Sequence, residues 1–135
     1  MASSLQPVIE AVRTKLLATA AVTSLLVNST AIYDHVTSGQ TGLYIEIGDG
    51  FEDDDDTFGL TGKRAQIFVT IWDSARTWKN IGSVETAVSD ALDRATLTVT
   101  GHTFIFCQHV RTDRIKETDE IRKSDMQFEV LTKES

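Results

Sequence analysis

The pattern of hydrophobic positions between residues 62 and 74 predicts a central strand. In an extended chain successive side chains point to opposite sides. One side of this segment is aliphatic and carries Ala65, Ile67, Val69 and Ile71. The other side is mixed and carries Arg64, Gln66, Phe68, Thr70 and Trp72. We expect the aliphatic side to lie against helices, and the mixed side to be solvated in a monomer and covered in an assembly.

Apolar residues at helical spacing predict two helices. The first begins at Ser3 or Ser4, either of which can cap it, and its apolar face consists of Leu5, Val8, Ile9, Val12 and Leu16. Residues 19–27 continue this helix or form a second short one. The other helix follows the central strand, with Asp73 or Ser74 as cap and a regular part from residue 83 to 94, after Gly82. Its apolar face consists of Val84, Ala87, Val88, Ala91, Leu92 and Ala95.

Five further segments have strand composition. Residues 31–36 and 43–47 can pair as a hairpin, and residues 96–99 and 103–112 predict a second hairpin around Thr100, Gly101 and His102. Residues 126–132 predict a closing strand, after a charged stretch at 113–125 that indicates an exposed loop or solvated strand ends. The whole order predicts an α+β protein whose mostly antiparallel sheet packs one face against both helices.

Length and composition predict one domain over residues 1–135, with enough chain for its own core. The lone Cys107 excludes an internal disulfide and favours a reducing, intracellular origin. No apolar run approaches the roughly 20 residues needed to span a bilayer, so we expect a soluble protein that does not enter a membrane.

The net charge of −7 comes from one stretch of the chain. Seven of the 20 acidic residues lie between positions 46 and 56 without a Lys or Arg among them, and the other acidic residues balance the 13 basic ones. Residues 48–61, with three glycines and four consecutive aspartates, predict a long mobile loop or an extended arm. The uniformly basic face of a duplex-binding protein is not present.

Metal chemistry has weak support in the sequence. Hard cations prefer several carboxylate oxygens, but the adjacent aspartates at 53–56 point to opposite sides of an extended chain. A solvated acidic loop or a partner-binding arm is therefore the better interpretation. Of His102, Cys107 and His109, only the last two share a strand face, whereas a structural zinc site needs four ligands. We expect no bound metal.

Catalytic chemistry has no sequence support either. The neighbours Asp34 and His35 face opposite sides of a strand and form no acid-base pair. The sequence contains no nucleophile elbow, P-loop, dinucleotide fingerprint or zinc-protease motif. We expect neither an enzyme nor a cofactor.

A succession of short segments runs through the chain in the order LQPVIEAVRTKL, AIYDHV, LYIEIGD, IFVTIWDS, VSDALD and LTVTGHTF. It resembles the tail-completion family of long-tailed bacteriophages and related phage-like particles, also known as tail-terminator or head-to-tail joining proteins. The matching positions are Ile32, Tyr33, Asp34, Tyr44, Ile47, Gly48, Trp72, Leu92, Gly101 and His102. The chain departs from the family at Leu43, where a proline is frequent, and in the acidity of residues 53–56.

The resemblance implies a structural virion protein that caps the finished tail tube as a ring, a hexamer, and presents a surface to the head connector or stopper protein. It implies that DNA passes through the bore without specific binding. The protein would act at the tail–head junction of the virion and would reside in the host cytoplasm during assembly.

Phe68 and Trp72 are the candidates for the ring interface, because aromatic side chains are enriched in interface cores, whereas we expect Trp78 in the core. The candidates for a partner-contact arm are Phe51, Glu52, Asp53, Asp54, Asp55, Asp56 and Phe58. The alternative function is a small acidic binding or regulatory protein that mimics nucleic acid.

Overall fold

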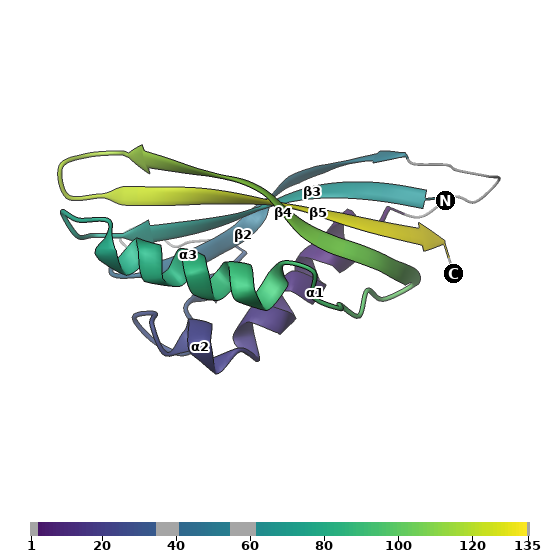
Figure 1. Cartoon of the computed structure of the whole chain (residues 1–135), viewed down its shortest axis with the longest axis horizontal. Helices are drawn as coiled ribbons and strands as arrows, with labels where there is room; N and C mark the ends of the chain where they lie inside the picture. The colour runs from purple at the N-terminus through teal and green to yellow at the C-terminus, as the bar shows by residue number, and fades with distance from the viewer. Residues whose placement is uncertain (1–2, 35–40, 55–61, 135) are drawn as a thin grey trace.

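A computed structural model describes residues 3–34, 41–54 and 62–134, and in this part of the chain three helices lie along one face of a five-stranded sheet (Figure 1). The helices are α1 (Leu5–Leu17), α2 (Ala20–Thr23) and α3 (Lys79–Leu92). The strands are β1 (Ile32–Tyr33), β2 (Tyr44–Asp54), β3 (Gly62–Asp73), β4 (His102–Lys116) and β5 (Arg122–Glu134). Their order in the sheet is β1-β2-β3-β5-β4, and every pair is antiparallel except β1–β2. The predicted α+β class is confirmed.

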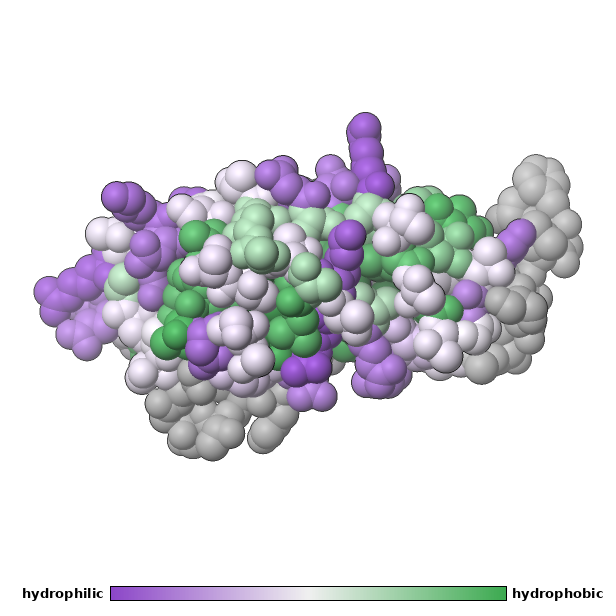
Figure 2. Space-filling view, turned by 90° about the horizontal axis from the view of Figure 1, so that it is seen from below, coloured by the Kyte–Doolittle hydropathy of each residue, from purple (hydrophilic) through white to green (hydrophobic). Residues whose placement is uncertain are grey.

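Strand β3 is central, as the alternation predicts, because it pairs with β2 on one side and β5 on the other. Its aliphatic side is fully buried under the helices. The same layer contains Ile45, Ile47, Met126 and Phe128 from the sheet, and Val8, Val12, Leu16, Val84, Val88 and Leu92 from α1 and α3. Burying one such side chain contributes about 1.5–3 kcal/mol, so this layer is the main source of stability. From the helix side, Figure 2 shows hydrophilic side chains interspersed with smaller apolar patches.

The predicted hairpin of residues 31–36 with 43–47 is wrong. β1 lies parallel to β2, with Ile32 beside Ile45, and the N–H of Ile45 donates to the carbonyl oxygen of Ala31 at 3.0 Å. Parallel pairing places the fully buried side chains of Ile32 and Ile45 together in the core. The antiparallel partner of β2 is β3.

The other predicted hairpin is wrong in its first half, because residues 96–99 form no strand. After α3, Arg94 has a positive φ of 60° and its N–H donates to the carbonyl oxygen of Cys107 at 2.7 Å, which turns the chain. Leu97 and Val99 are buried without strand pairing, so their alternation reflects packing over the edge of the core.

The predicted strand 103–112 is longer in the structure, where β4 and β5 are joined by a short turn. Most of the charged stretch 113–125 is therefore the solvated ends of two strands, one of the two predicted alternatives.

Helix α3 begins later than the predicted caps Asp73 and Ser74 imply, with Trp78 as its N-cap residue, but its regular part begins before the predicted residue 83. Gly82 lies inside its first turn, where its N–H donates to the carbonyl oxygen of Trp78 at 2.7 Å. The helix is therefore regular through a glycine that the sequence suggested would disturb it. The segment after α1 forms the short α2, which matches the second of the two predicted alternatives. No helix in the described ranges is long and apolar enough to cross a bilayer.

Residues 48–54 belong to β2, and residues 50–54 pair with β3, so this part of the predicted acidic loop is an extended arm. The predicted mobility of residues 55–61 concerns positions outside the described residues. The pairing shifts between Ile47 and Gly50, which marks a β-bulge. A Cβ at Gly50 would lie 2.6 Å from the carbonyl oxygen of Gln66, so only glycine lets β2 approach β3 here.

Candidate assembly surface

The candidate site is the face of the sheet that the helices leave uncovered, here named the open face (Figure 1). Directly paired residues of antiparallel strands point to the same side, so the register defines its members. They are Tyr44, Glu46, Phe51 and Asp53 from β2, the mixed side of β3, Lys123, Asp125, Gln127, Glu129 and Leu131 from β5, and Phe106, Gln108, Arg111, Asp113 and Ile115 from β4. The predicted separation of β3 into a helix-facing side and a mixed side is therefore confirmed.

Polar side chains form a hydrogen-bonded ladder across the middle of the open face. Gln127 donates to Gln66 at 2.8 Å, and Gln66 donates to Glu129 at 3.1 Å. Glu129 also forms an ion pair with Arg64, and the hydroxyl of Thr70 donates to Asp125 at 2.8 Å. Because these groups satisfy one another, the surface has a fixed shape to present to another protein.

Trp72 lies at one end of the open face and is held by its own chain. Its ring stacks on Tyr44 with centroids 6.3 Å apart, and Lys123 lies 5.2 Å from its centre. The indole N–H donates to Glu46 at 3.4 Å. The ring is half-buried and packs against the core, so Trp72 contributes to the fold as well as to the surface.

Phe68 lies in the middle of β3, half-buried on the open face and outside the apolar core cluster. It lines a hollow of about 130 Å³ together with Asp34, Glu46, Gly48 and Thr70. Of the two predicted ring-interface residues, Phe68 is the one whose ring is not already packed against the core.

The described part of the predicted arm is the end of β2. Phe51 is 49% exposed, and Asp53 is exposed beside it. Asp54 forms an ion pair with Lys63 across the strands. The remaining predicted arm residues, Asp55, Asp56 and Phe58, lie outside the described residues.

Glu52 fixes the start of the chain to this arm. One oxygen of its carboxylate accepts the backbone N–H and the hydroxyl of Ser4, each at 3.0 Å. Partial burial raises the pKa of Glu52, but hydrogen bonds from Ser3 and Ser4 and the charge of Lys63 outweigh it, and the pKa lies below its usual value. The first helix and the arm are therefore joined by a charge-assisted contact.

A second polar cluster fixes α3 to β4 and β5. Glu85 accepts two hydrogen bonds from Arg114, at 2.6 and 3.1 Å, and one from the hydroxyl of Ser124 at 2.6 Å. Arg114 also lies 5.3 Å from the ring centre of Trp78, with Arg122 at 5.6 Å. Trp78 packs against the core from this side, as expected. These contacts position the helix layer under the sheet, and they join residues too far apart in the sequence for a local pattern to predict.

Sequence reasoning also missed the exposed aliphatic residues of β4. Ile105, Val110 and Ile115 are 47%, 44% and 39% exposed on the strand at the edge of the sheet. The pairing of β4 with β5 shifts between Phe104 and Phe106 and again between His109 and Arg111, so Ile105 and Val110 are the extra residues of two bulges.

Of the groups considered for metal binding, Cys107 and His109 contact other parts of the chain. Cys107 is buried. Burial, and to a smaller extent the nearby negative charge of Asp93, raises the pKa of its thiol to about 12. His109 bonds to Thr112 at 2.7 Å and its ring lies 5.4 Å from that of Phe128. Within the described ranges no three His, Cys, Asp or Glu residues are grouped to hold a metal ion. His35 lies outside those ranges.

An uncovered sheet face of fixed shape, next to an arm with the exposed side chains of Phe51 and Asp53, is a surface suited to contact with other proteins. The sequence profile of the family described as tail completion protein gp17 matches residues 10–133, and the chain belongs to this family. The protein is therefore a structural tail protein of a phage-type virion.

A solved structure titled "Virion of native gene transfer agent (GTA) particle" contains a chain that is similar throughout. It is 25% identical, the match covers 93% of each chain, and the TM-score is 0.83. No curated protein matches the chain.

Proposed function

We propose that six copies of the protein form a ring that closes the end of the tail tube. In this proposal the ring also joins the tail tube to the head connector or stopper protein. The family match over residues 10–133 carries this proposal. In this role the chain acts by binding and not by catalysis. Phe68 on the open face is the candidate contact between subunits, because a half-buried aromatic side chain outside the core gains burial in an interface.

The acidic arm contacts a neighbouring protein in this proposal. The arm combines an exposed apolar ring, Phe51, with the exposed carboxylates of Asp53 and Asp54. An apolar residue with charged neighbours suits a protein interface with a polar rim. The seven acidic residues between positions 46 and 56 also repel phosphates. DNA therefore passes the ring without specific binding.

The nucleic-acid mimic is the weaker candidate. A mimic needs a continuous row of free negative charge, whereas Asp54 is paired with Lys63 and Glu52 is hydrogen-bonded to Ser4. Successive residues of β2 also point to opposite sides of the sheet. The acidic charge is therefore divided between two faces.

The test is the production of particles in which Asp53→Asn and Asp54→Asn remove two charges from the arm. We expect the variant to fold and to accumulate filled heads and finished tails that are not joined, counted in electron micrographs. The control is Asp119→Asn with Glu120→Gln, which removes two exposed charges from the turn after β4 and should leave joining normal. Normal joining with the arm variant would contradict the role of the arm.

A further inference from the structure

Strand β4 forms one lateral edge of the sheet and is unusually apolar for an edge. Four of the seven exposed large hydrophobic residues of the described chain, namely Ile105, Val110, Ile115 and Ile121, lie on β4 or in the turn that follows it. Proteins protect edge strands with charges, bulges or covering elements, and an apolar edge marks a contact with another chain. The two bulges of β4 interrupt its backbone hydrogen-bonding row, so such a contact uses side chains and not an added strand.

The opposite edge of the sheet has a different character. β1 covers β2 only at Ile45 and Glu46, and the rest of β2 runs on towards the arm. β2 contains five acidic residues and no basic one. β4 contains three basic residues and one acidic residue. By formal residue charge the two edges are therefore opposite in sign, although each basic residue of β4 also has an ion-pair partner within its own chain.

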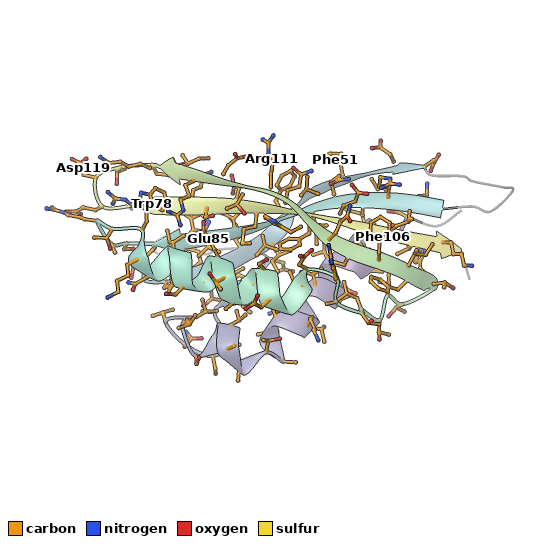
Figure 3. The ribbon with its side chains drawn as sticks, viewed as in Figure 1. Phe51, Trp78, Glu85, Phe106, Arg111 and Asp119 are labelled. Atoms are coloured by element: carbon orange, nitrogen blue, oxygen red, sulfur yellow. The ribbon has the colours of Figure 1, made fainter. Side chains whose placement is uncertain are left out.

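The best-placed groups for contact are Arg111 on β4 and the pair Asp53 and Asp54 on β2. The side chain of Arg111 is 67% exposed although it pairs with Asp113 at 2.9 Å. Asp53 is exposed, and the side chain of Asp54 is 70% exposed. Figure 3 shows Arg111 and Phe51 on the side of the sheet that faces away from the helices. Each edge thus has an apolar residue beside a charge, with the charges opposite in sign.

We infer that β4 of one copy docks against the acidic end of β2 of the next copy. Ile105, Val110 and Ile115 supply the apolar part of this contact, and Arg111 faces Asp53 and Asp54 of the neighbour. Because the two patches differ and lie on opposite edges of one sheet, the contact is head-to-tail and repeats from copy to copy, which generates a ring when the rotation closes. The inference rests on the proposed ring and adds these two edges to Phe68, the candidate subunit contact on the open face.

Charge reversal tests the pairing. Arg111→Glu places negative groups on both sides of the proposed contact, and the double change Asp53→Arg and Asp54→Arg places positive groups on both sides of it. We expect each variant alone to raise the concentration for half-assembly about tenfold or more, because facing like charges oppose docking. An equimolar mixture of the two variants restores opposite charges at every contact and should assemble close to the unchanged protein. Sedimentation velocity measures the assembled fraction, and thermal unfolding shows that each variant is folded.

Arg76→Glu is the matched control, because Arg76 is 75% exposed, is paired with Glu120 in the turn after β4, and is not among the residues of the proposed contact. It should assemble like the unchanged protein. Assembly of the Asp53→Arg and Asp54→Arg variant at the normal concentration would overturn the inference, and so would failure of the mixture to assemble while the unchanged protein does. If the unchanged protein forms no ring, either in solution or on tails, the proposed ring function is wrong, and the two edge surfaces are not the cause of the failure.

Discussion

The two aromatic side chains of the open face should differ in what their removal costs. Trp72→Ala removes the stacking on Tyr44, about 0.5–1.5 kcal/mol, and the contact with Lys123, about 0.5–1 kcal/mol. It also removes a ring packed against the core. The total is about 2–3 kcal/mol, equivalent to a decrease of about 10 °C in Tm for a chain of this size. Phe68→Ala removes a ring outside the core and should cost only about 1 kcal/mol of folding stability.

We expect the opposite order for assembly, where Phe68→Ala should have a larger effect than Trp72→Ala. Truncating an aromatic anchor at an interface weakens association by more than about 1 kcal/mol, so Phe68→Ala should raise the concentration for half-assembly about tenfold. Trp72→Phe retains a stacked ring and is the control for the fold. Thermal unfolding and sedimentation measure the two effects separately. A Phe68→Ala variant that unfolds as easily as Trp72→Ala, or that assembles normally, would refute this reasoning.

Three further predictions concern the fold. Gly50→Ala should destabilise by about 1–3 kcal/mol in urea unfolding, because its Cβ would collide with the β3 backbone, whereas Gly82→Ala, with only an ordinary contact to Arg114, should be neutral or stabilising. The pKa of Glu85 lies below its usual value because hydrogen bonds from Arg114 and Ser124 outweigh the burial that raises it. The contribution of the ionised Glu85 to folding stability is therefore complete above the unfolded pKa, near 4.5, and is lost as pH falls through the lower folded pKa. Acid should thus lower the Tm of Glu85→Gln less than the Tm of the unchanged protein. The Cys107 thiol, with its pKa raised to about 12 by burial, should not react with a thiol reagent at pH 8 until the chain unfolds; rapid reaction of the folded protein would contradict its buried position.

Much of the fold can be predicted from the sequence in those segments where hydrophobic residues recur at one constant spacing over many positions. The alternation along β3 and the helical spacing in α1 and α3 predict both the elements and their buried faces, because burial of one face selects those patterns. β1 was harder, because a strand of only two residues has no period, and its direction depends on which neighbour its buried Ile32 meets. Residues 96–99 alternate for packing and not for pairing.

The candidate site was predictable only in part. Phe68 and Trp72 were placed correctly on the mixed side of β3, but their different relation to the core depends on Tyr44 and Lys123, which are distant in sequence. The exposed edge of β4 was missed because the two bulges at Ile105 and Val110 break the two-residue period. Which residues are left at an edge is a property of strand order, and local pattern does not encode it.

The most direct test of the account is the number and position of copies of this chain in the particle. A reconstruction of the tail–head junction should show a closed ring of six copies at the head-proximal end of the tail tube, with β4 of each copy against β2 of the next. Native mass measurement of the protein released from tails should give the same number. A single copy at the junction, or a location elsewhere in the particle, would contradict the proposed function.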